Sequence, residues 1–487
     1  MNVIVLMLDS LRPDHLGCYG NKWIKTPNID RFAEECAVFD RAYAEGLPTL
    51  PVRTALFTGK YTLPFRGWQR LEPDDVPLAE VLWDRGYVTA LITDTYHMHK
   101  PGMAYERGFD YVEWIRGQES DPYIVDPNVK VDLERWHHKN YSTEQYFGKS
   151  AEERKRLFIQ YLKNTAHWKG EEDHFVVQVM KAGIRWLKKQ VEKGRKDRLF
   201  LWLDSFDPHE PWDPPQEYYE LYAPPGYEDK PITWGGGKVK DFTDLEIQHI
   251  RAQYAGEVTL VDRWVGWFLD RVRELGLWEN TLIILLSDHG EPLGEHGIVR
   301  KVYPWPYEEL SKVVLMIRHP EGIGKGKRIK AFVETVDILP TILDSLGLEC
   351  GREVSPWGLK IEGIHGKSLL PLMKGEVDAI KEFAISGHYK RSWSIRDGDY
   401  TLYIWLKPGA EYQWGLKPIG MREEKVKPEL YKTERDYVPP PPKDYDWRRD
   451  LPEKENLMDA EKDIARELEL KLRRKMLELL GHPSASS

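Results

Sequence analysis

The sequence predicts an α/β fold in which a large, mostly parallel sheet is covered by helices on both faces. Short apolar runs bounded by polar or turn residues have the length and composition of buried strands. Helical stretches lie between these runs, and strands that alternate with helices are typical of a parallel sheet. From about residue 376 the pattern changes to closely spaced β-like runs and a terminal helix, which predicts a smaller C-terminal α+β subdomain.

The strands of the main sheet follow from five apolar runs. They are Val3–Leu8, Val88–Ile92, Leu199–Leu203, Thr281–Leu286 and Val313–Ile317. The helices expected between them include Thr26–Glu35 and the basic amphipathic stretch Val176–Glu192. We therefore expect one α/β domain over residues 1–375, with a charged, irregular insertion over the sheet at about 116–172.

Residues 376–487 are expected to form the smaller subdomain. Its predicted strands are Phe383–Ser386, Ser392–Arg396 and Tyr400–Trp405. A final helix is predicted from about Asp459 to Leu480, with Gly481 placed to end it. One face of this helix carries its apolar residues, Ala465, Leu468, Leu472, Met476 and Leu479.

Composition excludes several classes of function. The 487 residues are 41% hydrophobic, enough for a large core, and the charged residues nearly balance at a net charge of -9. Because no Lys/Arg block stands out, we expect no nucleic-acid partner. Three scattered cysteines predict no disulfide framework, and we identify neither a signal peptide nor a membrane span. We expect a reduced, cytoplasmic enzyme without a membrane partner.

Acidic residues and histidines follow four of the predicted strands directly. In order along the chain these are Asp9, then Asp94 with His97, then Asp204, Asp207 and His209, and then Asp288 and His289. Ligands of open α/β sheets bind outside the carboxyl ends of the strands. One such Asp is more often a helix cap, but four sets at one edge favour a functional site.

Asp9, Asp288 and His289 are the predicted metal ligands. Carboxylates combined with a neutral imidazole suit Mn²⁺ or Zn²⁺ better than Ca²⁺, which prefers an all-oxygen shell. Three protein ligands leave positions open for a substrate and a nucleophile. Taken alone, a turn cap at Asp288 and a core histidine at His289 explain these two residues equally well, so the prediction depends on the whole set.

A second informative segment runs from Gly46 to Gly59. Pro51 fits the first turn of a helix and Gly59 its C-terminal stop. Thr49 then stands at the helix entrance, where free backbone N–H groups and the dipole favour an anion. Arg53, one turn later, can bring its guanidinium to the same anion. From this segment alone, an N-cap threonine and a surface arginine are the simpler interpretation.

The chain resembles the sulfatases, a family within the alkaline phosphatase superfamily. The N-terminal stretches that carry the resemblance read VIVLMLDSLRPDHLGCYGN, TPNIDRFAEECAVFDRAYA and TLPVRTALFTGK. In the family's order and approximate spacing follow LDSFDPHEPWDPP, SDHGEPLGEHG, YEELSKVVLMIRHP, VETVDILPTILDSLGL and GKSLLPLMKG. So many independent motifs, over roughly the first 380 residues, make a chance match very unlikely.

The resemblance implies an alkaline-phosphatase-like fold, with a large mixed sheet and a C-terminal subdomain that contains a small antiparallel sheet. The family's metal ligands match Asp9, Asp288 and His289. Its nucleophile, the first residue of a Cys/Ser-x-Pro-x-Arg motif, matches Thr49, with Pro51 and Arg53 in register. The family's sulfate-contacting histidine resembles His209, and the lysine on the leaving-group side resembles Lys301.

Three departures from the family pattern affect the expected chemistry. Sulfatases oxidise Cys or Ser at the nucleophile position to formylglycine, and Thr49 is neither, so we expect no formylglycine. Ser10 replaces a second acidic metal ligand. Thr95 and His97 stand where a Lys-Trp-His stretch is common, which leaves these two residues to bind substrate with one cation fewer.

Thr49 changes the mechanism that the resemblance implies. Formylglycine hydrate expels sulfate by collapsing to an aldehyde, whereas a threonyl ester has to be cleaved by water at sulfur or phosphorus. Phosphodiesterase relatives use a threonine nucleophile with two metals. Here His209 and Lys301 take the place of the second ion, so we expect one divalent metal, contacted also by Thr49, and a singly charged substrate group.

Three functions stay open at this point. The first is hydrolysis of small sulfate esters or related phospho- and phosphonate esters, with Thr49, Arg53, His209 and Lys301 as the catalytic residues. The second is a phosphodiesterase or phosphonate monoester hydrolase of the same mechanism. The third is a catalytically silent homologue that keeps the anion pocket. A homo-oligomer is compatible with each of them.

Overall fold

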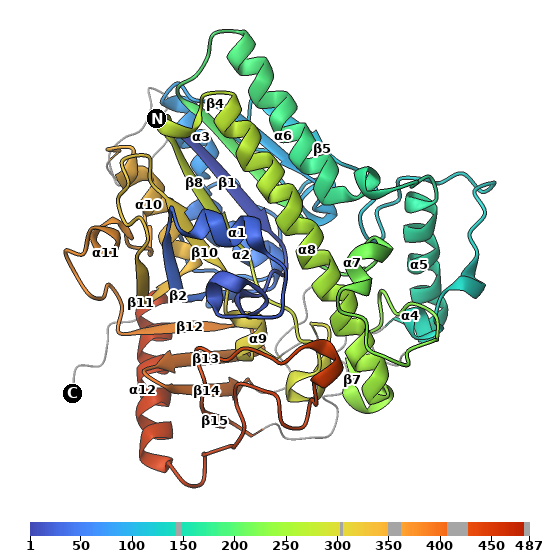
Figure 1. Ribbon diagram of the computed structural model, residues 1–487. Helices are drawn as coiled ribbons and strands as arrows, with labels where there is room; N and C mark the ends of the chain where they lie inside the picture. Colours follow the sequence, from blue (N-terminus) through green and yellow to red (C-terminus); the bar gives the residue numbers. More distant parts are fainter. Residues whose placement is uncertain (143–148, 302–304, 349–361, 407–426, 482–487) are drawn as a thin grey trace.

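The computed structural model describes residues 1–142, 149–301, 305–348, 362–406 and 427–481. Its centre is an eight-stranded sheet with the order β11-β2-β10-β8-β1-β6-β4-β5 (Figure 1). The sheet is mixed and mostly parallel, as predicted, because β10 alone runs antiparallel to both of its neighbours in this sheet. The strands are β1 (Asn2–Leu8), β2 (Ala37–Tyr43), β4 (Val88–Thr93), β5 (Tyr111–Trp114), β6 (Leu199–Ser205), β8 (Thr281–Leu286), β10 (Leu315–Arg318) and β11 (Arg328–Glu334).

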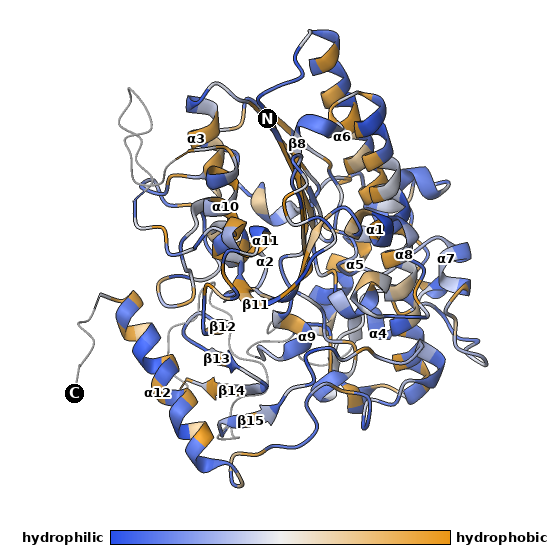
Figure 2. Ribbon diagram, turned by 60° about the vertical axis from the view of Figure 1, so that its left-hand side comes forward, coloured by the Kyte–Doolittle hydropathy of each residue, from blue (hydrophilic) through white to orange (hydrophobic). Residues whose placement is uncertain are grey.

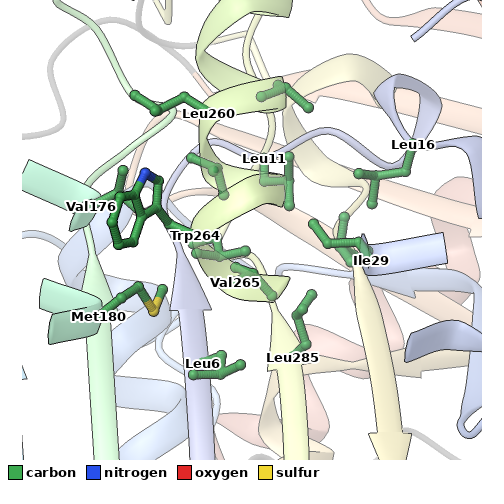
Figure 3. Close-up of a cluster of buried hydrophobic side chains, with 14 of the residues drawn as sticks. Leu6, Leu11, Leu16, Ile29, Val176, Met180, Leu260, Trp264, Val265 and Leu285 are labelled. Atoms are coloured by element: carbon green, nitrogen blue, oxygen red, sulfur yellow. The ribbon is translucent and has the colours of Figure 1, made fainter. Parts of the chain in front are cut away.

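Helices cover both faces of this sheet (Figure 2). On one face lie α1 (Pro27–Ala33), α6 (Phe175–Glu192) and α8 (Asp244–Glu274), and on the other α2 (Thr49–Thr58), α3 (Leu78–Asp84), α10 (Ile338–Ser345) and α11 (Leu370–Lys374). The alternation of side chains along β1 divides its apolar residues between the two cores. Figure 3 shows one of these cores, in which Trp264 and Val265 of α8 lie over Leu6 and Leu285 of the sheet.

A second, five-stranded sheet has the order β15-β14-β13-β12-β3. Its antiparallel part consists of β12 (Phe383–His388), β13 (Ser392–Asp397), β14 (Tyr400–Trp405) and β15 (Glu429–Lys432). The fifth strand, β3 (Gly46–Leu47), comes from the N-terminal part of the chain and pairs in parallel with β12. The second sheet therefore reaches the segment that directly precedes Thr49. The division at residue 375 stays a prediction.

The terminal helix α12 (Lys462–Leu479) packs against the second sheet through the predicted apolar face. Ala465, Leu468, Leu472 and Met476 are buried there. Figure 2 shows the alternation of polar and apolar residues along this helix. Gly481 has the positive φ of 74° that suits the residue just beyond a helix end.

We expect Leu472→Ala to lower the free energy of unfolding by about 2–5 kcal/mol, because the substitution leaves a cavity in a packed core. Leu472 is 0% exposed, whereas Leu470, two residues away on the same helix, is 56% exposed. Leu470→Ala is thus the matched control, with an expected change within about 0.5 kcal/mol. Urea unfolding of both variants measures the difference. Equal losses would show that α12 does not pack as described.

The region 116–172 is less irregular than predicted. It contains α4 (Lys139–Ser142) and the 15-residue α5 (Ala151–Thr165), whose start is fixed by a capping box between Ser150 and Glu153. The apolar side of α5 packs with Trp234 and Phe175 in a small core of its own, separate from the two cores of the main sheet. Strong capping and one apolar face thus stabilise a charged helix within this stretch, and its assignment as an insertion over the sheet stays a prediction.

His296 forms a buried ion-pair cluster that ties the C-terminal part to the main domain. Its Nδ1 lies 3.0 Å from Glu309 Oε1 and its Nε2 lies 3.4 Å from Glu453 Oε2. Tyr403 of β14 donates to the same Glu453 carboxylate at 2.9 and 2.8 Å. Burial alone would lower the pKa of His296, but Glu309, Glu453 and Glu429 outweigh it and raise the pKa to about 9.

This cluster predicts a loss of stability at alkaline pH. Because the pKa of His296 is higher in the folded state than its ordinary 6.5, the stabilisation is fully present below pH 6.5 and is lost as the pH rises through about 9. The shift corresponds to about 3 kcal/mol. We expect the free energy of unfolding of the wild type to fall towards that of His296→Gln between pH 6.5 and 9.5. A difference in the free energy of unfolding between the two proteins that stays constant across this pH range would contradict the assignment.

Among the described residues, no helix combines the length and the apolar composition needed to cross a membrane.

Candidate active site

Asp9, Asp288 and His289 come together at the carboxyl ends of β1 and β8, which are adjacent parallel strands. All three side chains are fully buried, and one ligand atom from each lies within 4.8 Å of the others. His289 Nε2 is 3.7 Å from Asp9 Oδ1 and 3.5 Å from Asp288 Oδ2. The chain thus brings together the three residues that the sequence indicates as metal ligands.

The histidine of this group has its lone pair on the side that faces the carboxylates. His289 Nδ1 donates to the carbonyl oxygen of Gly290 at 2.8 Å, which leaves Nε2 unprotonated. Burial lowers the pKa of His289 to about 4, so the imidazole is neutral near pH 7. Position 290 requires glycine, because a Cβ there would lie only 2.1 Å from the carbonyl oxygen of Glu309.

One of the two carboxylates of the group resists ionisation in this buried site. Burial, and next the charge of Asp288, raise the pKa of Asp9 well above its usual range. Ser10, which takes the left-handed φ of 62°, donates from its hydroxyl to Asp9 at 3.0 Å and from its N–H to Asp288 at 3.1 Å. Two buried carboxylates and an unprotonated imidazole are a donor set that a divalent cation fits.

Thr49 is the first residue of α2 and lies against the metal-ligand group. Its Oγ1 is 3.2 Å from His289 Nε2. The preceding β3 pairs with β12 at Gly387 and His388, so the second sheet fixes the approach of the chain to the helix start. Pro48 adopts an extended conformation before the helix, and Gly59 ends the helix with a φ of 66°. The hydroxyl therefore stands beside the donor atoms that would hold a cation.

Arg53 does not point to an open anion site in this structure. Its Nη1 donates to Asp288 Oδ2 at 2.6 Å, and its Nη2 donates to Asp9 Oδ2 at 3.1 Å. Its Nε donates to Asp204 Oδ2 at 3.0 Å, and its Nη2 donates to Asp204 Oδ1 at 2.6 Å. The remaining donor positions reach Thr49 O and Thr95 Oγ1 at 3.3 Å each. Direct donation from Arg53 to a substrate stays a prediction, and the geometry shows an arginine that orders the carboxylates.

Lys301 lies between two buried carboxylates. Its ammonium donates to Glu210 Oε2 at 2.9 Å and to Glu291 Oε2 at 2.8 Å. His209 stacks on Phe206 at 3.8 Å and donates from Nδ1 to the carbonyl oxygen of Glu210 at 2.6 Å. Burial, and next the charge of Lys301, lower the pKa of His209 well below its usual value. A neutral imidazole with an unprotonated Nε2 can accept a proton.

The two predicted substrate-binding residues have different surroundings. Thr95 donates its hydroxyl to Asp204 Oδ1 at 2.6 Å and so belongs to the Arg53 network. His97 Nε2 lies 2.7 Å from Glu119 Oε2, and its ring meets Trp68 edge-on at 4.9 Å. Thr95 is therefore fully buried behind the arginine, whereas His97 belongs to a neighbouring aromatic and acidic group.

Several residues of this site were not singled out from the sequence. Asp204 stands among the acidic residues after the strands but was not assigned a role. Glu210 and Glu291 lie within two of the family-like stretches but were given no role of their own, and Glu119 carried no motif signal. Asp94 and Asp207 carry no contact to the metal-ligand group, because they accept backbone N–H bonds from Phe206 and Val176 at 2.7 and 2.9 Å. A further group able to hold a metal, Glu119, His209 and Glu210, lies next to Arg300 and Lys301.

Comparison with known proteins agrees with this arrangement. The sequence model of the sulfatase family matches residues 1–348, which is well over half of the chain. The chain belongs to the sulfatase family. An N-acetylglucosamine-6-O-sulfatase of Bacteroides thetaiotaomicron is 26% identical over 449 residues, covering 82% of this chain and 78% of that protein.

Two further relatives of this sulfatase-family chain extend the comparison. An arylsulfatase of Clostridium perfringens is 26% identical and covers 74% of this chain and 77% of its own length. The crystal structure of a phosphonate monoester hydrolase of Agrobacterium radiobacter superposes with a TM-score of 0.70 at 21% identity, covering 99% of this chain and 95% of that one. The alkaline-phosphatase-like fold expected from the sequence is thereby confirmed.

Proposed function

We propose that this sulfatase-family chain hydrolyses small sulfate esters, or related phospho- and phosphonate esters, through Thr49 and without formylglycine. The observation that carries the proposal is the 3.2 Å approach of Thr49 Oγ1 to His289 Nε2, inside a group of buried metal-type ligands. Free cysteines at Cys18 and Cys36 agree with a reducing, cytoplasmic compartment.

Asp9, Asp288 and His289 would hold one divalent metal, with Mn²⁺ or Zn²⁺ favoured by the imidazole ligand. When bound, such an ion lowers the pKa of a nearby hydroxyl and balances negative charge on the ester group. Arg53 orders Asp9 and Asp288 by donating to one oxygen of each. The ligand carboxylates are thus held in place from the side of α2.

The reaction divides into two displacements. In the first, Thr49 Oγ1 releases its proton to solvent and forms a bond to sulfur or phosphorus, while the bond to the ester oxygen breaks and this oxygen leaves with a proton from the ammonium of Lys301. In the second, water attacks the same atom and gives one proton to Nε2 of His209, while the bond to Thr49 Oγ1 breaks and this oxygen regains a proton from solvent. The proton on His209 then returns to Lys301 through solvent, which restores the starting state. The neutral His209, with its Nδ1–H fixed on Glu210 O, suits the base role.

A phosphodiesterase or phosphonate monoester hydrolase is the second candidate, and Thr49 favours it specifically. A threonyl ester cannot collapse to an aldehyde, so its cleavage needs attack by water at the central atom, and this path works equally at phosphorus. The third candidate, a silent anion-binding homologue, does not account for the buried proton acceptor His209 or for the ammonium of Lys301, whose charge acts on Asp9, His289 and His209.

Turnover of p-nitrophenyl sulfate, bis-p-nitrophenyl phosphate and p-nitrophenyl phenylphosphonate separates these candidates. The protein is loaded with Mn²⁺ or Zn²⁺, and metal content is measured in the same samples. We expect release of p-nitrophenol from at least one of the esters, abolished by chelation and restored by the ion. Background rates on all three with metal bound would reject hydrolysis of these ester classes.

A further inference from the structure

Asp204 places a third carboxylate beside Arg53, and the proposed mechanism gives this residue no role. Asp204 lies in β6 next to its end and is completely buried. Its Oδ2 accepts from Arg53 Nε at 3.0 Å and from Trp202 Nε1 at 3.2 Å. Its Oδ1 accepts from Arg53 Nη2 and from Thr95 Oγ1, each at 2.6 Å. Both oxygens are thus held by donors, and each accepts from a different nitrogen of the Arg53 guanidinium.

Asp204 completes the charge balance around Arg53. A divalent ion at Asp9 and Asp288 matches the charges of these two residues. The third carboxylate, Asp204, then balances the charge of Arg53 in a buried, bidentate ion pair. Thr95 adds a hydroxyl but no charge at this place. The nucleophile side of the site therefore has no surplus positive charge.

The leaving-group side does not supply the missing charge either. The ammonium of Lys301 is hydrogen-bonded to Glu210 and Glu291, and Arg300 pairs with Glu210 and lies 3.9 Å from Glu119. The two cations therefore face the carboxylates of Glu210 and Glu119 even without a charge on Glu291. In a buried site with a low effective dielectric, each uncompensated unit of substrate charge is costly. An ester group with one negative charge is therefore easier to bind than a group with two.

We propose that Asp204 is a specificity-determining residue, which neutralises Arg53 and thereby restricts the site to singly charged ester groups: sulfate esters, phosphodiesters and phosphonate monoesters. The selection would exclude phosphate monoesters, which carry two charges near neutral pH. This inference rests on the proposed function, because it concerns the charge of the group that Thr49 would attack. Asp204 acts through Arg53 and is not itself a catalytic residue.

Equilibrium binding tests the inference without depending on turnover. The two ligands are p-nitrophenyl phosphate, which carries two charges, and p-nitrophenyl sulfate, which carries one on the same aryl group. Their Kd values are measured by calorimetry at pH 8 on metal-loaded protein that carries Thr49→Ala, which prevents reaction. We expect Asp204→Asn to shift the ratio of the two Kd values by about tenfold or more in favour of the phosphate.

Two further variants control for loss of packing. Asp262→Asn removes another buried carboxylate, which accepts from Ile29 N at 2.7 Å and has no contact with Arg53, so the ratio should stay within about twofold of the parent. Thr95→Lys adds a cation while Asp204 stays in place and should shift the ratio in the same direction as Asp204→Asn. Thr95→Lys also provides a test of the charge preference if Asp204→Asn does not fold.

The outcomes separate the two proposals. If the wild type turns over no ester but Asp204→Asn and Thr95→Lys still favour the doubly charged ligand, the proposed function is wrong and the charge assignment holds. If both variants leave the ratio where Asp262→Asn leaves it, Asp204 does not set the charge preference and the inference is overturned. A loss of affinity for both ligands alike would also overturn it, since that is the result of a purely structural role.

Discussion

Replacing Thr49 with alanine is expected to lower kcat by at least about 10³-fold while metal binding is retained. The hydroxyl is the atom that would form the covalent bond, and its polar contact is with His289 Nε2 at 3.2 Å. No carboxylate ligand of the proposed metal depends on it. The measurement is steady-state turnover of the best aryl ester, with metal content determined on the same preparation.

Thr49→Ser is the matched control for this variant. A serine keeps a hydroxyl at the start of α2 and should retain a large part of the activity, because the proposed mechanism needs the oxygen and not the methyl group. If Thr49→Ala were as active as Thr49→Ser, the nucleophile would have to be another group. If both variants lost the metal, the defect would lie in the site and not in the chemistry.

Replacing His289 with alanine is expected to weaken metal binding by at least about 100-fold and to abolish turnover at micromolar metal. The substitution removes the one neutral ligand from a group whose two carboxylates stay buried together. Loss of the ion also removes its stabilisation of the folded state, so the rise in Tm on adding Mn²⁺ or Zn²⁺ should disappear. Metal titration by calorimetry and thermal unfolding provide the two readouts.

His319→Ala is the control for this metal-ligand variant. His319 is buried but follows Arg318, whose pairing with Ile283 places it towards the opposite end of the sheet from Asp288. Its ring nitrogen accepts from Glu321 N at 3.2 Å, a local contact. We expect unchanged metal affinity there. Metal affinity that is equal in His289→Ala and the wild type would contradict the ligand assignment.

The predictable part of the fold consists of short, continuous apolar runs and of a helix with a single apolar face. The strands β1, β4, β6 and β8 are buried along almost their whole length, and their apolar runs end in polar residues. α12 was identified from a single apolar face. Both signals are local patterns of apolar residues, which the sequence displays directly.

The longest helix was not predicted because it lacks such a pattern. α8 has 31 residues, and its buried positions run almost all the way round the helix. They include charged residues such as Arg251, which pairs with Glu295, and Glu257, which accepts from the backbone N–H of Asp213. A helix that is buried on every side shows no polar face, so local periodicity does not reveal it. Partners that are distant in sequence decide its place.

In the candidate site, too, contacts between segments that are distant in sequence could not be predicted. The meeting of Asp9, Asp288 and His289 could be predicted because parallel strands bring their carboxyl ends to one edge. The partners of Arg53 could not, because a guanidinium one turn into a helix looks equally suited to an anion and to a carboxylate. The convergence of β6 with α2, which brings Asp204 to Arg53, is a tertiary event that leaves no mark on either segment.

The most direct test of the central claim is to trap the covalent intermediate. The metal-loaded protein is mixed with an activated aryl ester, quenched in acid within the first turnover and digested, and the peptide that contains Thr49 is analysed by mass spectrometry. The account predicts a mass increase of one sulfuryl, phosphoryl or phosphonyl group on Thr49, which decays as the aryl alcohol accumulates further. Turnover by a protein whose Thr49 never carries the group, or a group on another residue, would contradict it.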